Sequence, residues 1–301
     1  MNELEPAIAL LDRSCELLQK QQTNIALNQV YFDLWKYRNR WPKDIWQTFC
    51  TKICRDHPLT QAIHTSPISH RAYTKPRGYA GDAILMDYLY EYQPQFSSQV
   101  YNWEYRMLGP KSVRSRRFII ADIIKKLVVD KKHFNILSLA CGHMREAFDL
   151  PPSTLKQISN YYGLDADEES LHIVDEKAKE IWQIKTVKAN VVQLLKSDLQ
   201  LPQFDLAYTL GLSDYLKNPF VKKLIVRVFS MLVKGGKFII ANFTPNLIDS
   251  GYIETFMDWH LFYRDEQAMI SLLQGLPPNA YHYHLFRDEF KNIVFLEVTK
   301  L

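Results

Sequence analysis

The segment Phe134–Phe148 constrains the fold of this chain more than any other part of it. Ile136–Leu139 is a short apolar run without alternation, of the kind that forms a parallel strand covered on both faces. Ala140, Cys141 and Gly142 follow, and such small residues let a ligand approach the backbone closely. A helix that contains Glu146 is predicted next. In an open α/β sheet, this strand end is where the nucleotide-binding crevice forms.

Three later segments fit the same kind of sheet. Tyr161–Asp165 is a short apolar strand that ends in a carboxylate, about 20 residues downstream, where such folds place the acid that binds ribose hydroxyls. Phe204–Leu216 is a strand followed by a turn that contains glycine and serine, and Lys234–Phe243 is a glycine turn leading into a strongly apolar strand. Strands that alternate with helical spacers predict a doubly wound parallel sheet.

From Phe134 to the C-terminus, the chain resembles class I S-adenosylmethionine (SAM)-dependent methyltransferases. Matching segments are Leu137–Gly142 at the first motif, Gly163–Asp165 at the acidic second strand, Lys188–Val191 beside adenine, Leu206–Asp214 beside the transferable methyl, and Gly235–Gly236 at the turn that opens the fifth strand. The resemblance implies an α/β fold with a Rossmann-like seven-stranded sheet. It also implies SAM as cofactor and S-adenosylhomocysteine (SAH) as product, held by Ala140, Cys141, Gly142, Asp165, Ala166, Asn190, Val191, Thr209, Leu210 and Gly211.

The loop after the first strand departs from the family pattern. His143 and Met144 stand where further glycines are usual, so we expect a less open loop. A dehydrogenase would more often keep the full G-x-G-x-x-G motif, so we rank binding of a nicotinamide cofactor below binding of SAM. Asp165 has the alternative role of helix N-cap, but Asp167 fits that role better. Asn190 is equally well explained as a cap.

A narrower resemblance lies upstream. Lys75–Asp82, followed by Ala83–Tyr90, is similar to a block in a bacterial subgroup of methyltransferases that includes enzymes making methyl esters of hydroxy fatty acids, and Gly142–Glu146 fits that subgroup's first motif. The resemblance favours a lid in which Arg77 and Tyr79 cover the donor, since a ring face attracts a cation by about 0.5–2 kcal/mol. Spacing alone favours a helix-start turn with Asp82 as N-cap and an Arg77–Asp82 surface pair.

Arg114, Arg116 and Arg117 form the one basic cluster. Arg114 and Arg117 share a helical face by their spacing, and we assign Arg114 to the carboxylate of the donor. A charged surface face is the commoner explanation for such a cluster. An acidic substrate or an RNA phosphate is a further alternative.

Acceptor residues are expected after the fourth and fifth strands. Asp214 and Tyr215 follow the fourth strand, and the aromatic segment Phe256–Arg264 follows the fifth. We expect Trp259 and Tyr263 to line the acceptor pocket, with Tyr79, His260 and Tyr263 as catalytic candidates. Packing of the aromatic residues against the sheet is the competing explanation. His282 and His284 lack metal-ligand partners in the sequence, so no metal is predicted.

The composition sets the outer limits. With 301 residues, the chain is long enough for two domains, and a net charge of +4 does not by itself indicate nucleic acid. The four cysteines show neither metal nor disulfide spacing. No apolar stretch is long enough to cross a bilayer, and no secretory signal is evident at the start. We therefore expect a cytoplasmic protein.

The N-terminal part reads as helices. Residues 3–22, 25–37, 42–55 and 112–129 have helical patterns, and a polar break at residues 130–132 suggests the domain boundary. We predict a helical cap, lid and substrate domain over residues 1–130 and a methyltransferase domain over residues 131–301.

The predicted reaction is SAM-dependent methylation of a small-molecule, lipid or peptide-like natural product, at a carboxylate oxygen. Alternatives are N-methylation or hydroxyl-O-methylation of another metabolite, then RNA or protein methylation, and a donor-binding module without activity. The fourth-strand segment lacks an Asn-Pro-Pro-Tyr-like sequence, which argues against methylation of DNA bases. The acceptor and the oligomeric state are not predicted.

Overall fold

In the computed structural model, which describes residues 4–96, 98–196 and 199–301, the chain forms two compact units. The helical unit contains the residues up to Val113 together with Asn246–His260. The sheet unit contains Arg114–Pro245 and Leu261–Leu301. The helical unit therefore receives a short segment from the second half of the sequence.

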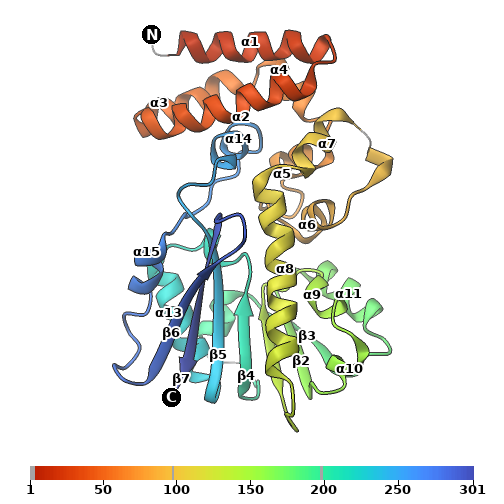
Figure 1. Cartoon of the computed structure of the whole chain (residues 1–301), viewed down its shortest axis with the longest axis vertical. Helices are drawn as coiled ribbons and strands as arrows, with labels where there is room; N and C mark the ends of the chain where they lie inside the picture. The colour runs from red at the N-terminus through yellow and green to blue at the C-terminus, as the bar shows by residue number, and fades with distance from the viewer. Residues whose placement is uncertain (1–3, 97, 197–198) are drawn as a thin grey trace. The chain divides into compact units, whose positions relative to one another are not determined.

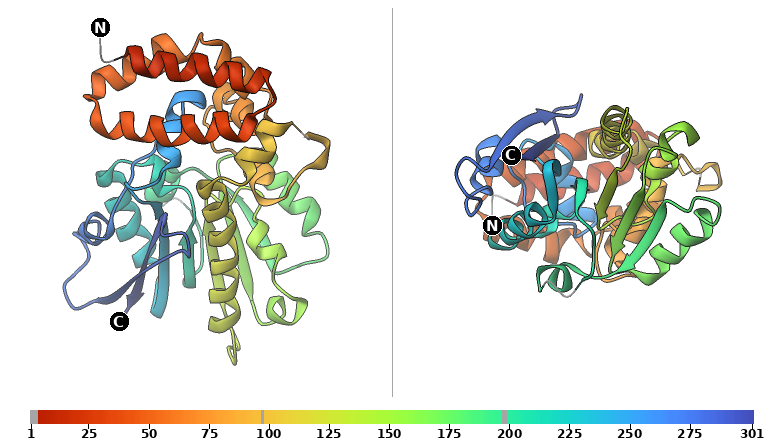
Figure 2. Two further views of the ribbon diagram at one scale, coloured as in Figure 1. Left: turned by 45° about the horizontal axis from the view of Figure 1, so that its top comes forward. Right: turned by 90° about the horizontal axis from the view of Figure 1, so that it is seen from below.

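The helical unit is built from short helices around the antiparallel pair α1 and α2, which lie side by side in Figures 1 and 2. Its helices are α1 (Glu5–Gln19), α2 (Thr23–Arg40), α3 (Lys43–Thr48), the π-helix η1 (Phe49–Cys54), α4 (Pro58–Ile63), α5 (Pro67–Thr74), α6 (Ala83–Tyr90), the 3₁₀ turn η2 (Pro94–Phe96), α7 (Gln99–Tyr105), the start of α8 (Leu108–Leu127) and α14 (Asp249–Phe256).

The predicted helices at the start of the chain are confirmed, with one change of type. The helix expected over residues 42–55 is α-helical only as far as Thr48 and continues as a π-helix. Cys50 and Cys54 are both buried there, so they belong to the core of the helical unit. Helices α4 and α5 begin with Pro58 and Pro67, which follow His57 and Ser66. Proline suits this position because it lacks the N–H that a first helical turn leaves unpaired.

Buried carboxyl groups organise the core of the helical unit. Glu104 accepts hydrogen bonds from the hydroxyls of Ser66 and Ser69 and, at 2.8 Å, from Tyr252 Oη. Burial raises the pKa of Glu104 to about 7, although the three hydroxyls act in the opposite direction. The contacts join α5, α7 and α14 through one carboxyl.

The α14 segment is anchored to the helices that precede it in sequence. Tyr31 Oη donates to Asp249 Oδ2 at 2.8 Å, and Trp46 Nε1 donates to Glu254 Oε2 at 2.8 Å. A Cβ added at Gly251 would lie 2.6 Å from the backbone of Leu34. Only glycine lets α14 approach α2 so closely.

The sheet unit is a seven-stranded sheet in the order β3-β2-β1-β4-β5-β7-β6. Strands β1 to β5 are parallel, and β7 runs antiparallel to β5 and β6. The strands are β1 (Asn135–Leu139), β2 (Asn160–Asp165), β3 (Ile184–Lys188), β4 (Phe204–Thr209), β5 (Leu232–Phe243), β6 (Tyr281–Arg287) and β7 (Ile293–Lys300). The helices between them, with the 3₁₀ turn η3, are α9 (Arg145–Phe148), α10 (Pro152–Leu155), α11 (Glu168–Lys177), α12 (Val191–Leu195), η3 (Ser213–Tyr215), α13 (Asn218–Ser230) and α15 (Glu266–Ser271).

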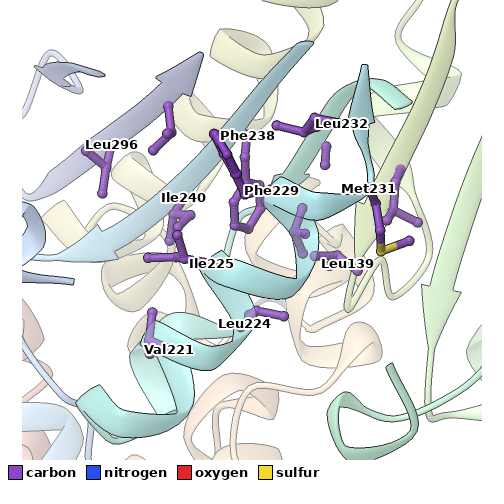
Figure 3. Packing of buried hydrophobic residues seen from close by; sticks show 14 of the residues in the cluster. Leu139, Val221, Leu224, Ile225, Phe229, Met231, Leu232, Phe238, Ile240 and Leu296 are labelled. Atoms are coloured by element: carbon purple, nitrogen blue, oxygen red, sulfur yellow. The ribbon is translucent and has the colours of Figure 1, made fainter. Parts of the chain in front are cut away.

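One face of this sheet packs against α12, α13 and α15. Figure 3 shows apolar side chains of α13, among them Leu224 and Phe229, beside those of the strands, such as Phe238 and Ile240. Burying side chains of this size contributes about 1.5–3 kcal/mol each. The opposite face carries Ser138, Tyr161 and Tyr208, of which Ser138 and Tyr208 are register partners, whereas Tyr161 pairs with Ile136. Coverage of both faces explains why the strands read as unbroken apolar runs.

The glycine pair in β5 was predicted to open the strand, and this prediction is wrong. Strand β5 begins at Leu232, and Gly235–Gly236 lies inside it, where the pairing with β4 shifts between Phe204 and Leu206. Gly235 has φ +78°, which favours glycine. The pair therefore forms an irregularity in β5 and does not start it.

Of the helices within the described residues, none combines the length and the apolar character that a membrane span requires.

Candidate functional site

The loop after β1 has an unusual backbone. Ala140, Gly142 and Met144 have φ values of +52°, +51° and +49°, and a non-glycine residue in this region costs about 1–3 kcal/mol. His143 and Met144 are buried, consistent with the expected closed loop. Strained residues of this kind concentrate at functional sites.

Asp165, at the end of β2, holds this loop. Its Oδ2 accepts a hydrogen bond from Gly142 N at 2.8 Å, and its Oδ1 accepts one from Asp167 N at 2.9 Å. The side chain is 8% exposed. An ionised carboxylate has about four acceptor positions, so Asp165 retains acceptor capacity for a ligand. Asp167 occupies the N-cap position of α11, as the sequence suggested, but its side chain forms no capping hydrogen bond.

Two sulfur atoms pack the loop onto β2. A Cβ added at Gly163 would lie 2.9 Å from Met144 Sδ and 3.0 Å from Cys141 Sγ, so a larger residue at this position would have to displace the sulfur atoms. Burial raises the pKa of the Cys141 thiol, and the carboxylates of Asp165 and Glu146 raise it further. Cys141 therefore remains a thiol at neutral pH and is not a nucleophile.

A buried polar network supports the loop on the sheet face opposite α12, α13 and α15. Glu146 accepts hydrogen bonds from Tyr208 Oη at 2.5 Å and Ser138 Oγ at 3.3 Å, and the hydroxyls of Tyr161 and Tyr208 lie 2.6 Å apart. Burial raises the pKa of Glu146. The network connects β1, β2, β4 and α9. It was not predicted from the sequence, where the only related signal was the place of Glu146 in the motif after the first strand.

Asn190 closes a capping box at the start of α12. Its Oδ1 accepts from Gln193 N at 2.9 Å, and Gln193 Oε1 accepts from Asn190 N at 2.9 Å. Asn190 and Ala166 are exposed, whereas Val191 is half-buried. The capping role is confirmed, and contact of these residues with adenine stays a prediction.

The end of β4 lies next to β1 in the sheet and carries a buried polar atom. Thr209 is fully buried, and its Oγ1 has no hydrogen-bond partner within the described part of the chain. Leu210 is buried, and Gly211 is half-buried. Parallel strands β1, β2 and β4 bring the loop, Asp165 and Thr209 to one edge of the sheet.

Asp214 links β4 to β5. Its Oδ1 accepts from Phe243 N at 2.8 Å, and its backbone carbonyl accepts from Phe262 N at 2.7 Å. Burial raises the pKa of Asp214 to about 7, although Arg116 and Arg264 act in the opposite direction. The structure therefore shows a bridging role for Asp214. Tyr215, which follows it, is half-buried.

Arg264 was not predicted from the sequence, yet it holds the turn at Asp214. Its guanidinium donates to Ser213 O at 2.8 Å, Leu216 O at 2.5 Å and Asn242 Oδ1 at 2.6 Å. Arg264 lies in an irregular segment with no periodic pattern, so the local sequence did not predict its contacts with the turn at Asp214.

The basic cluster divides into three different environments. Arg116 is 6% exposed, Arg117 forms an ion pair with Asp149, and Arg114 is half-buried. The cluster is therefore not a uniformly exposed charged face. Binding of the donor carboxylate by Arg114 stays a prediction.

The remaining predicted residues lie mostly in the helical unit. Arg77 is half-buried and Tyr79 is 38% exposed, both between α5 and α6, and Trp259 and His260 follow α14. Tyr263 belongs to the sheet unit. The catalytic and substrate roles of these residues stay predictions. Asp82 caps α6 through Leu85 N at 2.9 Å, as predicted, and it also binds Arg71.

No group of His, Cys, Asp and Glu among the described residues is arranged to hold a metal ion. His282 and His284 both lie exposed on β6.

Searches with the sequence against protein-family models and against curated proteins returned no match. The solved structures that are similar in fold include the following two. A protein of Bordetella parapertussis, described as a possible exported protein, superposes with a TM-score of 0.63 at 16% identity, covering 87% of this chain and 98% of that chain. The magnesium protoporphyrin IX methyltransferase of Synechocystis PCC 6803, with bound SAH, superposes with a TM-score of 0.52 at 13% identity, covering 77% and 98%. The chain therefore has a Rossmann-like methyltransferase fold with additional N-terminal helices.

Proposed function

We propose that this protein is a SAM-dependent methyltransferase that methylates a carboxylate oxygen of a small-molecule, lipid or peptide-like acceptor. The observation that carries the proposal is the contact between Asp165 and the loop after β1, because Gly142 N donates to the Asp165 carboxylate. This contact joins a closely packed backbone loop to a carboxylate that would accept hydrogen bonds from ribose hydroxyls. Both lie at one edge of a sheet with the methyltransferase fold. The similar Synechocystis protein was solved with SAH, which supports the choice of cofactor.

The residues at this edge suit each part of SAM. Asp165 would accept hydrogen bonds from the ribose hydroxyls, the backbone of Ala140–Gly142 would lie against the amino-acid part, and Asn190 and Val191 would flank adenine. Thr209–Gly211 would border the reacting centre. When bound, SAM would supply an activated methyl group on a positively charged sulfur.

The protein's contribution would be binding, orientation and exclusion of water. Holding two reactants in line supplies about 7–11 kcal/mol of barrier reduction. The acceptor oxygen forms a bond to the methyl carbon while the carbon–sulfur bond breaks and its electron pair stays on sulfur. A carboxylate has no proton to lose in this step, so it needs no general base. We further propose that the helical unit acts as a lid and contributes acceptor-binding residues.

Methylation of a hydroxyl or amine is the second candidate reaction, and it is favoured by the buried carboxyl of Asp214. The pKa of this carboxyl is raised to about 7 by burial, close to the value suited to a general base at neutral pH.

Calorimetry with purified protein tests the cofactor assignment. We expect heat of binding and thermal stabilisation with both SAM and SAH, and their absence would overturn the proposal. Turnover on panels of acids, alcohols, amines and RNA, measured by SAH release and by mass spectrometry of the product, separates the acceptor classes. Tight SAM binding without turnover on any panel would indicate a donor-binding module.

A further inference from the structure

The side chain of Glu146 ties the two ends of the loop after β1 together. Glu146 is the second residue of α9, at the far end of the loop, and Ser138 is the last residue but one of β1. Ser138 Oγ donates to Glu146 Oε1 at 3.3 Å, and both side chains are buried. The hydrogen bond therefore connects the strand before the loop to the helix after it.

Two tyrosines extend this contact into the neighbouring strands. Tyr208 of β4 donates to the same oxygen of Glu146 at 2.5 Å, and the hydroxyls of Tyr208 and Tyr161, which lies in β2, are 2.6 Å apart. Since the single proton of the Tyr208 hydroxyl goes to Glu146, Tyr161 donates to Tyr208. Both tyrosines are fully buried, so a lost partner would not be replaced by bulk water, and the three groups hold one another in one arrangement.

The loop needs support of this kind because its backbone is strained. Ala140 and Met144 are non-glycine residues with positive φ, and such residues persist only where the surrounding contacts over-determine them. Met144 stands directly before α9, and its N–H donates to Cys141 O at 2.8 Å. A shift of Glu146 would therefore pass to the backbone at Cys141 and Gly142.

The groups proposed for the nucleoside are held separately. Asp165 accepts from Gly142 N in the loop, but it also accepts from Asp167 N at 2.9 Å, and this second bond lies outside the loop. Asn190 is fixed by its own capping box with Gln193. A disturbance beneath the loop would therefore affect the ribose and adenine positions less than the backbone that faces the amino-acid part of SAM.

We propose that Glu146, acting through the loop, is a positioning residue for the methyl donor, and that Tyr208 and Tyr161 fix it in place. The network shapes the backbone from Ala140 to Gly142 to receive the amino-acid part of SAM, and its members do not act on the reacting atoms. This inference rests on the proposed methyltransferase function and deepens it. The network thereby sets the affinity for ligands that carry an amino-acid part and leaves the affinity for the nucleoside alone nearly unchanged.

The test compares two probes by isothermal titration calorimetry. SAH carries the amino-acid part, whereas 5′-methylthioadenosine lacks it and keeps the nucleoside and the sulfur. We expect Tyr208→Phe and Glu146→Gln to weaken SAH binding about 5- to 30-fold, the factor for one hydrogen bond lost in a buried site. Binding of 5′-methylthioadenosine should stay within about threefold of the wild type.

The neighbouring tyrosine of β2 supplies the matched control. Tyr162 packs against Phe204 on the opposite face of the sheet, so Tyr162→Phe removes a hydroxyl from the same strand outside the network and should leave both affinities unchanged. Tyr161→Phe removes the hydroxyl farthest from the loop and should weaken SAH binding less than Tyr208→Phe does. These two network variants keep the ring packing, so they decide the question if Glu146→Gln does not fold.

A double-mutant cycle completes the test. If Glu146 and Tyr208 act as one unit, the double variant should lose little more SAH affinity than either single variant, and additive losses would contradict the inference. Unchanged SAH affinity in every network variant would overturn it and leave the proposed function intact. Equal losses for SAH and 5′-methylthioadenosine would do the same, because a merely structural role predicts them. Failure of both probes to bind the wild-type protein would reject the proposed function, and the inference with it.

Discussion

Replacing Asp165 by Asn tests the connection between loop and ligand most directly. The carboxylate accepts from Gly142 N at 2.8 Å and from Asp167 N at 2.9 Å. Asparagine keeps one acceptor oxygen and turns an N–H group toward the other backbone donor. Each hydrogen bond to a charged group contributes about 1.5–3 kcal/mol, and the ribose would lose its charged acceptor as well.

We therefore expect Asp165→Asn to weaken SAM binding by about 2–4 kcal/mol, which is about 30- to 1,000-fold in Kd. Isothermal titration calorimetry on protein that shows wild-type circular dichroism gives the value. The matched control is Asp167→Asn, which removes the same charge two residues away, where the carboxylate accepts from Ser170 Oγ. SAM affinity within threefold of wild type in Asp165→Asn would refute the reasoning.

Three further predictions concern buried groups. Burial raises the pKa of Glu104 from its ordinary 4.5 to about 7, so the folded protein holds this proton more tightly than the unfolded chain does. The contribution of the protonated carboxyl to the free energy of unfolding is fully present below pH 4.5. It is lost, by about 3 kcal/mol, as the pH rises through 7. Urea titrations from pH 4.5 to 8 should show this fall in the wild type and a smaller one in Glu104→Gln; equal slopes would contradict it. Gly163→Ala, whose Cβ would crowd Met144 and Cys141, should lower stability by about 1–3 kcal/mol and weaken SAM binding, and an unchanged melting temperature would show that the loop yields freely. Arg264→Met should cost about 3 kcal/mol or more, because the buried carbonyl of Ser213 and the partly buried carbonyl of Leu216 would lose their charged donor. Denaturant unfolding measures the loss, and a change below 1 kcal/mol would show that water replaces the guanidinium.

Local patterns were sufficient to place the strands that build the site. The runs at β1, β2 and β4 are apolar because both sheet faces are covered. Asp165 could be identified from its position after β2, and the structure shows its carboxylate bonded to the loop. The glycine pair of β5 was misread, because a glycine turn and a strand irregularity have the same local composition.

Contacts between distant residues were beyond sequence reasoning. Nothing in the periodicity of Asp249–Phe256 indicates that Asp249 binds Tyr31 and that Glu254 binds Trp46 in the helical unit. The burial of Arg116 against Gly211 was equally hidden, since an arginine-rich helix reads as a solvated face.

The amino-acid sequence by itself determined the alternation of strands and helices, the small-residue loop after β1 and the acid at the end of β2. These features depend on backbone preferences and side-chain periodicity within a few residues. Only the tertiary structure decided which carboxyls are buried with raised pKa values, which hydroxyls they bind, and which arginine reaches the end of β4. Desolvation and hydrogen bonding depend on neighbours that lie tens to hundreds of residues away along the chain, and folding alone brings those neighbours together.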